Sequence, residues 1–196
     1  MIKRVFDVFL SLISLLLLLP VLIIVSILID VTSKGTVFYR QERVGKNNKD
    51  FKIFKFRTMH ANADKKGLLT VGGRDPRITS IGYYLRKYKV DELPQLINVL
   101  IGNMSLVGPR PEVRKYVNLY SEEHLKVLSV KPGITDLASI KFRNENEILA
   151  HQEEPNQYYI DVIMPTKIEI NLEYIKERSF LKDVGVILKT FKVILK

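Results

Sequence analysis

The feature that most constrains this chain is an uncharged run of 22 residues at positions 8–29, eighteen of which are apolar. As a helix with a rise of about 1.5 Å per residue the run is roughly 33 Å long, close to the ~30 Å hydrocarbon core of a bilayer. Its interior Pro20 costs about 3 kcal/mol in a helix, less than the roughly 5–10 kcal/mol that the apolar side chains gain on insertion. We therefore expect residues 1–33 to anchor the chain in a membrane, with a bend at Pro20.

Two arrangements of this segment remain open. A cleaved signal peptide is disfavoured because the run is long and residues 26–30 offer no small-x-small cleavage site. Lys3 and Arg4 precede the run, and residues 34–57 carry eight basic side chains against two acidic ones. Basic flanks favour the cytoplasmic side of a membrane. A straight span places one flank outside and a re-entrant hairpin keeps both inside, and the residues alone favour the two arrangements equally.

The composition excludes several classes of protein. A length of 196 residues suits one domain. The absence of cysteine excludes disulfides, zinc–cysteine sites and a cysteine nucleophile. The net charge of +10 predicts an anionic partner, such as nucleic acid, a phosphorylated substrate or an acidic lipid surface. No P-loop, G-x-G-x-x-G or G-x-S-x-G motif is present, and the three histidines lie far apart in the sequence.

The remainder, residues 34–196, predicts a small mixed domain and hence an α+β fold class. Residues 37–40 and 51–57 alternate apolar and basic side chains, which predicts a β-hairpin. Helices are expected at residues 78–87, 91–100 and 112–128, and residues 144–155 are expected to be irregular. The stretch 181–196 has an apolar face and a lysine face, typical of either a core-packing helix or a helix in the membrane interface.

Two adjacent carboxylates, Asp91 and Glu92, stand at a predicted helix start among basic residues. One interpretation is a helix N-terminus, which Asp91 caps. The other is a phosphate and metal site, because arginine grips phosphate oxygens and a carboxylate with substrate phosphates suits Mg²⁺. The surrounding cations would keep Asp91 ionised and able to attack phosphorus. Nearby basic residues are Arg86, Lys87, Lys89 and Arg110.

Several motifs in fixed order give the chain a wider resemblance. It resembles the bacterial sugar transferase family, the monotopic phosphoglycosyl transferases that act on polyprenol phosphate, over essentially its whole length. The chain departs from the family pattern at Leu19 before Pro20, at Asp136 in place of a usual glycine, and in residues 137–143. The motifs are FYRQERVG at 38–45, FKFRTM at 54–59, DPRIT at 75–79, DELPQLINVL at 91–100, VGPRP at 107–111 and KPGIT at 131–135.

The resemblance implies the transfer of a sugar phosphate from a UDP-sugar to a polyprenol phosphate such as undecaprenyl phosphate. The products are a polyprenol-diphosphate-linked sugar and UMP. Asp91 becomes the nucleophile, forming a covalent phosphosugar intermediate, and a ligand of Mg²⁺, for which Mn²⁺ could substitute. Glu92 supports it, for example in proton handling. Lys55, Arg86, Arg110 and Arg143 become the phosphate and nucleotide contacts.

The resemblance also favours the re-entrant arrangement, with a helix-break-helix at Pro20 and residues 34–196 as a catalytic domain on the cytoplasmic face of the bacterial inner membrane. The expected partners are the UDP-sugar, the polyprenol phosphate, the lipid bilayer and downstream glycosyltransferases, without nucleic acid. The alternative is a non-catalytic, membrane-tethered basic binding module. That alternative does not explain why Asp91 and Glu92 lie among basic residues.

Overall fold

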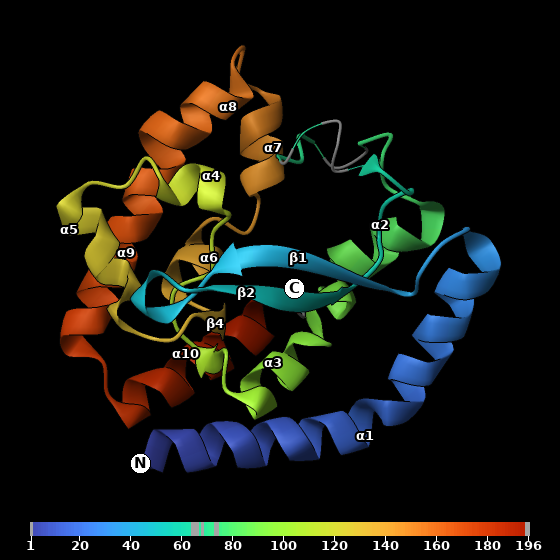
Figure 1. Cartoon of the computed structure of the whole chain (residues 1–196), viewed down its shortest axis with the longest axis horizontal. Helices are drawn as coiled ribbons and strands as arrows, with labels where there is room; N and C mark the ends of the chain where they lie inside the picture. The colour runs from blue at the N-terminus through green and yellow to red at the C-terminus, as the bar shows by residue number, and fades with distance from the viewer. Residues whose placement is uncertain (1, 64–66, 68, 73–74, 195–196) are drawn as a thin grey trace.

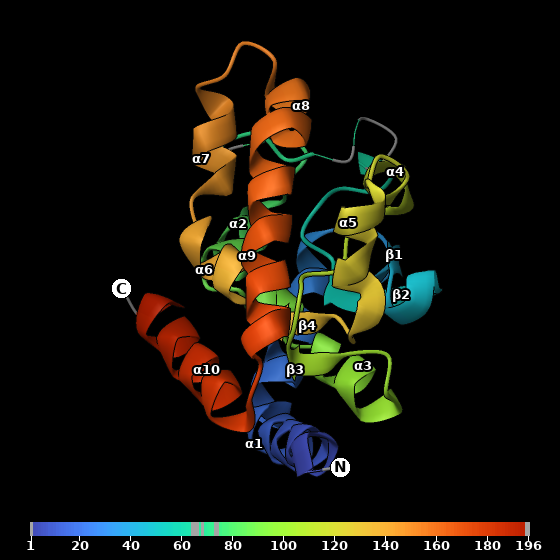
Figure 2. The ribbon, with the colours of Figure 1, turned by 90° about the vertical axis from the view of Figure 1, so that its left-hand side faces the viewer.

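The computed structural model describes residues 2–63, 67, 69–72 and 75–194. A long N-terminal helix, α1, runs along one side of a compact part that holds two small two-stranded sheets among short helices (Figure 1). The predicted mixture of helices and a β-hairpin is thus confirmed. Figure 2 shows α1, α3 and α10 gathered at one end of the molecule, and α7 and α8 at the other.

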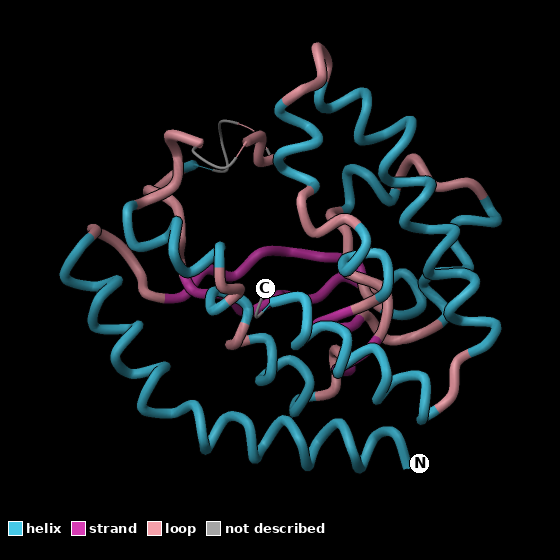
Figure 3. Tube along the Cα trace, turned by 180° about the vertical axis from the view of Figure 1, so that it is seen from behind, coloured by secondary structure: helices cyan, strands magenta, loops and turns pink. Residues whose placement is uncertain are grey.

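Helix α1 spans Ile2–Thr32 with Pro20 inside it. Among the described residues it is the helix long and apolar enough to cross a membrane. Figures 1 and 3 show that it is continuous but bent, so that its second part turns away from the line of the first. A proline removes one backbone hydrogen bond and displaces the preceding turn, which accounts for a bend in a helix of this length.

The N-terminal end of α1 is bonded to the compact part by its polar side chains. Arg4 donates to the carbonyl oxygens of Val99 and, at 2.9 Å, of Leu100, in the last turn of α3 (Gln95–Ile101). The buried Asp7 accepts from Ser105 Oγ at 2.8 Å. Because the last carbonyls of a helix lack internal partners and carry partial negative charge, Arg4 satisfies them favourably.

The C-terminal end of α1 is bonded to the same compact part. The buried Arg57, which follows strand β2, donates to Ser33 O at 2.7 Å and to Ser33 Oγ at 2.8 Å. Val25 and Ile29 pack with Phe56 in a buried apolar cluster. Both ends of the apolar helix therefore contact one folded body.

The predicted hairpin is confirmed as β1 (Phe38–Val44) and β2 (Asp50–Phe56), joined by a 3-10 turn at Lys46–Asn48. The strands are antiparallel, and Tyr39 lies opposite Lys55. Ile53 is buried in the main core, and Lys55, two residues further along β2, lies on the same face of the strand.

The second sheet pairs β3 (Ser105–Val107) with β4 (Gly133–Thr135) in parallel. The backbone after β3 lies so close to β4 that a Cβ on Gly133 would stand 2.1 Å from the amide nitrogen of Gly108. Only glycine fits such an approach. This contact fixes where the Pro109-Arg110-Pro111 segment leaves the sheet.

Two helix predictions were wrong. The single helix expected at 112–128 is three short ones, because the Ser121 side chain accepts from His124 N at 3.2 Å and starts a new helix. Residues 144–155, expected to be irregular, are mostly helical because Leu149 is fully buried.

The helices of the compact part, besides those already given, are α2 (Ser80–Lys87), α4 (Arg114–Val117), α5 (Glu122–Leu125), a 3-10 helix (Lys126–Ser129), α6 (Leu137–Lys141), α7 (Glu145–Ala150), α8 (Pro155–Tyr158), a π-helix (Tyr159–Ile163) and α9 (Met164–Glu177).

The C-terminal helix α10 (Phe180–Ile194) fits both interpretations of its sequence. Val186 is buried in the main core, whereas Leu188 is 65% and Phe191 60% exposed. Residues 195–196 of the predicted stretch lie outside the described residues. The helix thus packs on the domain and still presents an apolar surface near α1.

Candidate active site

The carboxylate pair stands in a tight backbone turn between two helices. Asp91 and Glu92 belong to a 3-10 turn at Val90–Glu92, just before α3. Lys89, in the left-handed region at φ 56°, lets the chain turn sharply after α2. Asp91 and Glu92 are 6% and 7% exposed. Two adjacent carboxyl groups are therefore held largely away from water.

Glu92 is paired with two of the predicted basic residues. Lys55 Nζ donates to its Oε1 at 3.0 Å, and the Arg110 guanidinium bonds both oxygens, with Nη1 at 3.0 Å from Oε2. Burial alone would raise the pKa of Glu92, but Arg110 and Lys55 hold it well below its usual range. Glu92 is therefore ionised, with both oxygens engaged.

Asp91 has the opposite environment. Its Oδ1 is buried and has no hydrogen-bond partner among the described residues. The helix-cap interpretation is not supported, since Pro94 occupies the N-cap position of α3 and no side chain caps it. Burial and the neighbouring Glu92 raise the pKa of Asp91, against the weaker effects of Lys55 and Arg86. The pKa of Asp91 in the substrate-free protein therefore lies above its usual value, because burial and Glu92 outweigh the cations around it.

The dyad lines a cavity of about 780 Å³, within the range of small-molecule sites. An unpaired buried carboxylate oxygen costs stability, which makes it a natural point for a ligand to bind. The cavity also has an apolar wall formed by side chains of α1 and α10. That wall contains Leu10 and Leu18 from α1 and Ile187, Phe191 and Ile194 from α10.

The other predicted site residues are distributed around this cavity. Arg86 lines it and donates to Thr70 Oγ1 at 3.0 Å. Arg143 also lines it, but its guanidinium donates to Val193 O on α10 rather than to the dyad. The structure thus brings Lys55 and Arg110 onto the dyad and leaves Arg86 and Arg143 on the cavity wall. Pro20 lies within α1 and not in the cavity lining.

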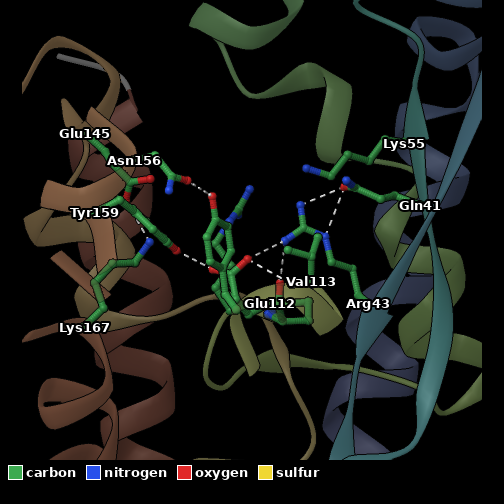
Figure 4. A network of polar contacts seen from close by, with 12 residues as sticks. Gln41, Arg43, Lys55, Glu112, Val113, Glu145, Asn156, Tyr159 and Lys167 are labelled. Carbon is green, nitrogen blue, oxygen red and sulfur yellow. Dashed lines mark hydrogen bonds and ion pairs between the residues drawn. The ribbon is translucent and has the colours of Figure 1, made fainter. Parts of the chain in front are cut away.

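Sequence reasoning missed a polar network on another side of the cavity. Figure 4 shows Glu112 between Arg43 of β1 and Tyr159 of the π-helix. Arg43 also holds Gln41 Oε1 through Nε at 3.0 Å. The available signals were the alternation of β1, which places Gln41 and Arg43 on one face, and the position of Glu112 directly after Pro111.

A divalent cation fits the donor set only in part. Asp91 Oδ1 is an unpaired hard oxygen, suited to Mg²⁺. The oxygens of Glu92 are occupied by Lys55 and Arg110. No group of three or more histidine, aspartate or glutamate side chains with metal-site geometry is found in the described part of the chain. Any Mg²⁺ here therefore depends on oxygens from a phosphorylated substrate.

Comparison with known proteins identifies the family. The whole chain, residues 1–196, matches the family described as "Bacterial sugar transferase". It is 36% identical, over 99% of its length, to the UDP-N-acetylgalactosamine-undecaprenyl-phosphate N-acetylgalactosaminephosphotransferase of Aeromonas hydrophila. It is 37% identical, over 97% of its length, to the UDP-glucose:undecaprenyl-phosphate glucose-1-phosphate transferase of Escherichia coli (strain K12). The chain belongs to the bacterial sugar transferase family, as its motifs indicated.

The relatives differ in length from this chain. It covers 44% of the Aeromonas protein and 39% of the Escherichia coli protein, and so spans less than half of either. It covers 84% of the exopolysaccharide production protein ExoY of Sinorhizobium fredii, to which it is 33% identical over 98% of its own length. The shared part contains the dyad, the cavity and α1.

The raised pKa of Asp91 predicts a pH-dependent effect of Asp91→Asn on stability. The folded protein binds this proton more tightly than the unfolded chain, so wild type loses stability as pH rises through the pKa of Asp91 in the folded state. Asparagine cannot ionise. In EDTA and without substrate, Asp91→Asn should therefore be more stable than wild type at neutral pH, and the difference should shrink as pH falls toward 4. Thermal unfolding followed by circular dichroism checks this, and a pH-independent difference would contradict it.

Proposed function

We propose that this chain transfers a sugar phosphate from a UDP-sugar to undecaprenyl phosphate, giving an undecaprenyl-diphosphate-linked sugar and UMP. The observation that carries the proposal is the buried, unpaired Asp91 Oδ1 beside a Glu92 held by two cations, in a cavity with an apolar wall. The names of the two transferases above, which match 99% and 97% of this chain's length, support the same substrates.

The reaction proceeds by two displacements at one phosphorus atom. Asp91 Oδ1 attacks the phosphorus that carries the sugar, an O–P bond forms, and the bond to the UMP oxygen breaks. UMP leaves, and a phosphate oxygen of undecaprenyl phosphate attacks the same phosphorus and releases Asp91. A covalent intermediate lets two bulky substrates use one cavity in turn.

The surrounding side chains supply charge where the reaction needs it. The raised pKa of Asp91 disfavours its reactive, ionised form in the empty protein, so cations near it are required. Lys55 and Arg110 are fixed by Glu92, while Arg86 and Arg143 line the cavity as phosphate contacts. Because its own pKa lies well below its usual range, we assign Glu92 to holding these cations rather than to accepting protons.

The dyad can be tested with and without acceptor. Asp91→Asn should reduce turnover to background while the protein stays folded, because it removes the nucleophilic oxygen. Glu92→Gln should lower kcat by on the order of 10²- to 10³-fold, since preorganised charge is worth that much in comparable sites. Wild type incubated with UDP-sugar alone should gain one sugar phosphate by intact-protein mass spectrometry. An Asp91→Asn variant that still turns over, with deamidation excluded, would overturn the nucleophile.

Mg²⁺ is the cofactor we propose, held by Asp91 and by oxygens of the substrate diphosphate. When bound, it would neutralise charge on the reacting phosphates and lower the pKa of Asp91. EDTA should therefore abolish UMP release, and Mg²⁺ or Mn²⁺ should restore it. Full turnover in EDTA, measured by UMP release with undecaprenyl phosphate, would remove the metal from the proposal.

We also propose that α1 is re-entrant, entering and leaving one leaflet at the cytoplasmic face of the inner membrane. The contacts of Arg4 and Asp7 at one end of the helix and of Arg57 at the other support this, because a span would require one set to break. The bend of α1, which holds Pro20 inside it, brings the two ends toward the same body. This placement sets the apolar cavity wall beside the lipid acceptor and leaves the product available to cytoplasmic glycosyltransferases.

Cysteine labelling tests this topology cleanly, because the chain has no native cysteine. Ile2→Cys should resist a membrane-impermeant thiol reagent in intact cells and react once the membrane is opened. A cysteine placed at the exposed Lys49 of the hairpin serves as the matched cytoplasmic control. If the reagent labels position 2 but not position 49 in intact cells, α1 spans the membrane and the re-entrant arrangement is wrong.

A further inference from the structure

The segment that carries Arg110 has no regular secondary structure, so its shape depends on its attachments. On one side it is bonded to the second sheet, where Gly108 N donates to Thr135 O at 3.1 Å and Gly133 N to Pro109 O at 3.0 Å. The rings of Pro109 and Pro111 restrict the backbone on both sides of Arg110. The segment therefore needs a second attachment after Pro111 to fix the direction of the arginine.

Glu112 provides that second attachment. Val113 N donates to its Oε1 at 2.9 Å, Arg43 Nη1 to the same oxygen at 3.2 Å, and the Tyr159 hydroxyl to Oε2. Figure 4 shows these groups converging from the hairpin side and from the α9 side. The Glu112 side chain thus joins three separate parts of the chain.

The backbone on either side of this residue is held by the same neighbours. Arg43 Nη1 donates to Pro111 O at 3.0 Å, and Val44 N donates to Glu112 O at 2.9 Å. Although burial would raise the pKa of Glu112, Arg43 and Lys167 hold it below its usual range. Glu112 is therefore an ionised, fully bonded group inside the protein, and satisfied buried networks of this kind are rigid.

We propose that Glu112 is a positioning residue, which fixes the 109–112 backbone so that the Arg110 guanidinium meets both oxygens of Glu92. The inference rests on the proposed function and extends it, since Glu112 does not bond the dyad. A two-pronged arginine–carboxylate contact is directional, so a small rotation of the segment breaks one of its two bonds. Displacements of about 1 Å can cost on the order of 10²-fold in rate.

Two neighbouring tyrosines offer a matched test. Tyr159 and Tyr116 are both buried, and their rings pack with centroids 5.0 Å apart. The Tyr159 hydroxyl bonds Glu112, whereas the Tyr116 hydroxyl donates to Asn156 Oδ1 at 2.9 Å. Tyr159→Phe and Tyr116→Phe therefore each delete one hydroxyl from the same cluster, but only the first touches Glu112.

Hydrogen exchange in lipid nanodiscs gives a readout that needs no activity. Amides in a peptide covering residues 105–117 should exchange faster in Tyr159→Phe than in wild type, and at the wild-type rate in Tyr116→Phe at positions 108–113. Equal exchange in both variants at those positions would overturn the proposal. This comparison decides the matter even if no UDP-sugar is turned over, an outcome that would defeat the proposed function alone.

Turnover gives the second readout. Tyr159→Phe should lower kcat by roughly 10- to 100-fold with little change in KM, while Tyr116→Phe stays within about threefold of wild type. In a double-mutant cycle with Arg110→Lys, the Tyr159→Phe loss should largely disappear, because the two changes act on one contact. Additive losses would show that Tyr159 acts independently of the Arg110 contact and would overturn the positioning role.

Discussion

The buried contact of Glu92 with Lys55 and Arg110 is the interaction on which the site depends. It joins strand β2, the turn before α3 and the segment after β3, which lie far apart in the sequence. Removing one partner from such a group typically costs about 3–5 kcal/mol, because a buried charge is left uncompensated. The same contact holds two cations near Asp91. The bonds that stabilise the fold here are therefore also the bonds that place charge in the site.

Asp91 shows the opposite balance. Its oxygen is buried without a partner, and the turn that places it requires a left-handed Lys89. Both features lower the stability of the folded state and serve no packing purpose. A group kept at such a cost is typical of a site that becomes satisfied only when its ligand arrives. The Asp91 and Glu92 carboxyls, adjacent in sequence and both buried, thus differ in pKa because Lys55 and Arg110 bond Glu92 and offset its burial.

Much of this arrangement could be predicted from the sequence. The rest depends on contacts between residues that are far apart in the chain, which a local sequence pattern does not reveal. The alternation in 37–57 gave the hairpin, and Gly102 correctly ended α3, because both signals are local. The splitting of residues 112–128 and the helix at 145–150 depended on a serine cap and on burial of Leu149, and burial is set by distant residues. The bonding of Glu92 to Arg110 rather than to α3 likewise requires the close approach of β3 and β4.

The short helix α3 has a consequence for the height of the chemistry above the bilayer. Arg4, near the start of α1, bonds the last carbonyls of α3, and Asp91 and Glu92 lie just before the other end of that helix. Seven residues of helix measure about 10 Å. In the proposed membrane arrangement, α3 is therefore a spacer between the lipid headgroups and Asp91, the proposed nucleophile. A lipid phosphate would then reach Asp91 at the same distance from the bilayer whatever the length of its hydrocarbon tail. The choice of acceptor should therefore depend on the phosphate and the first part of the lipid rather than on tail length.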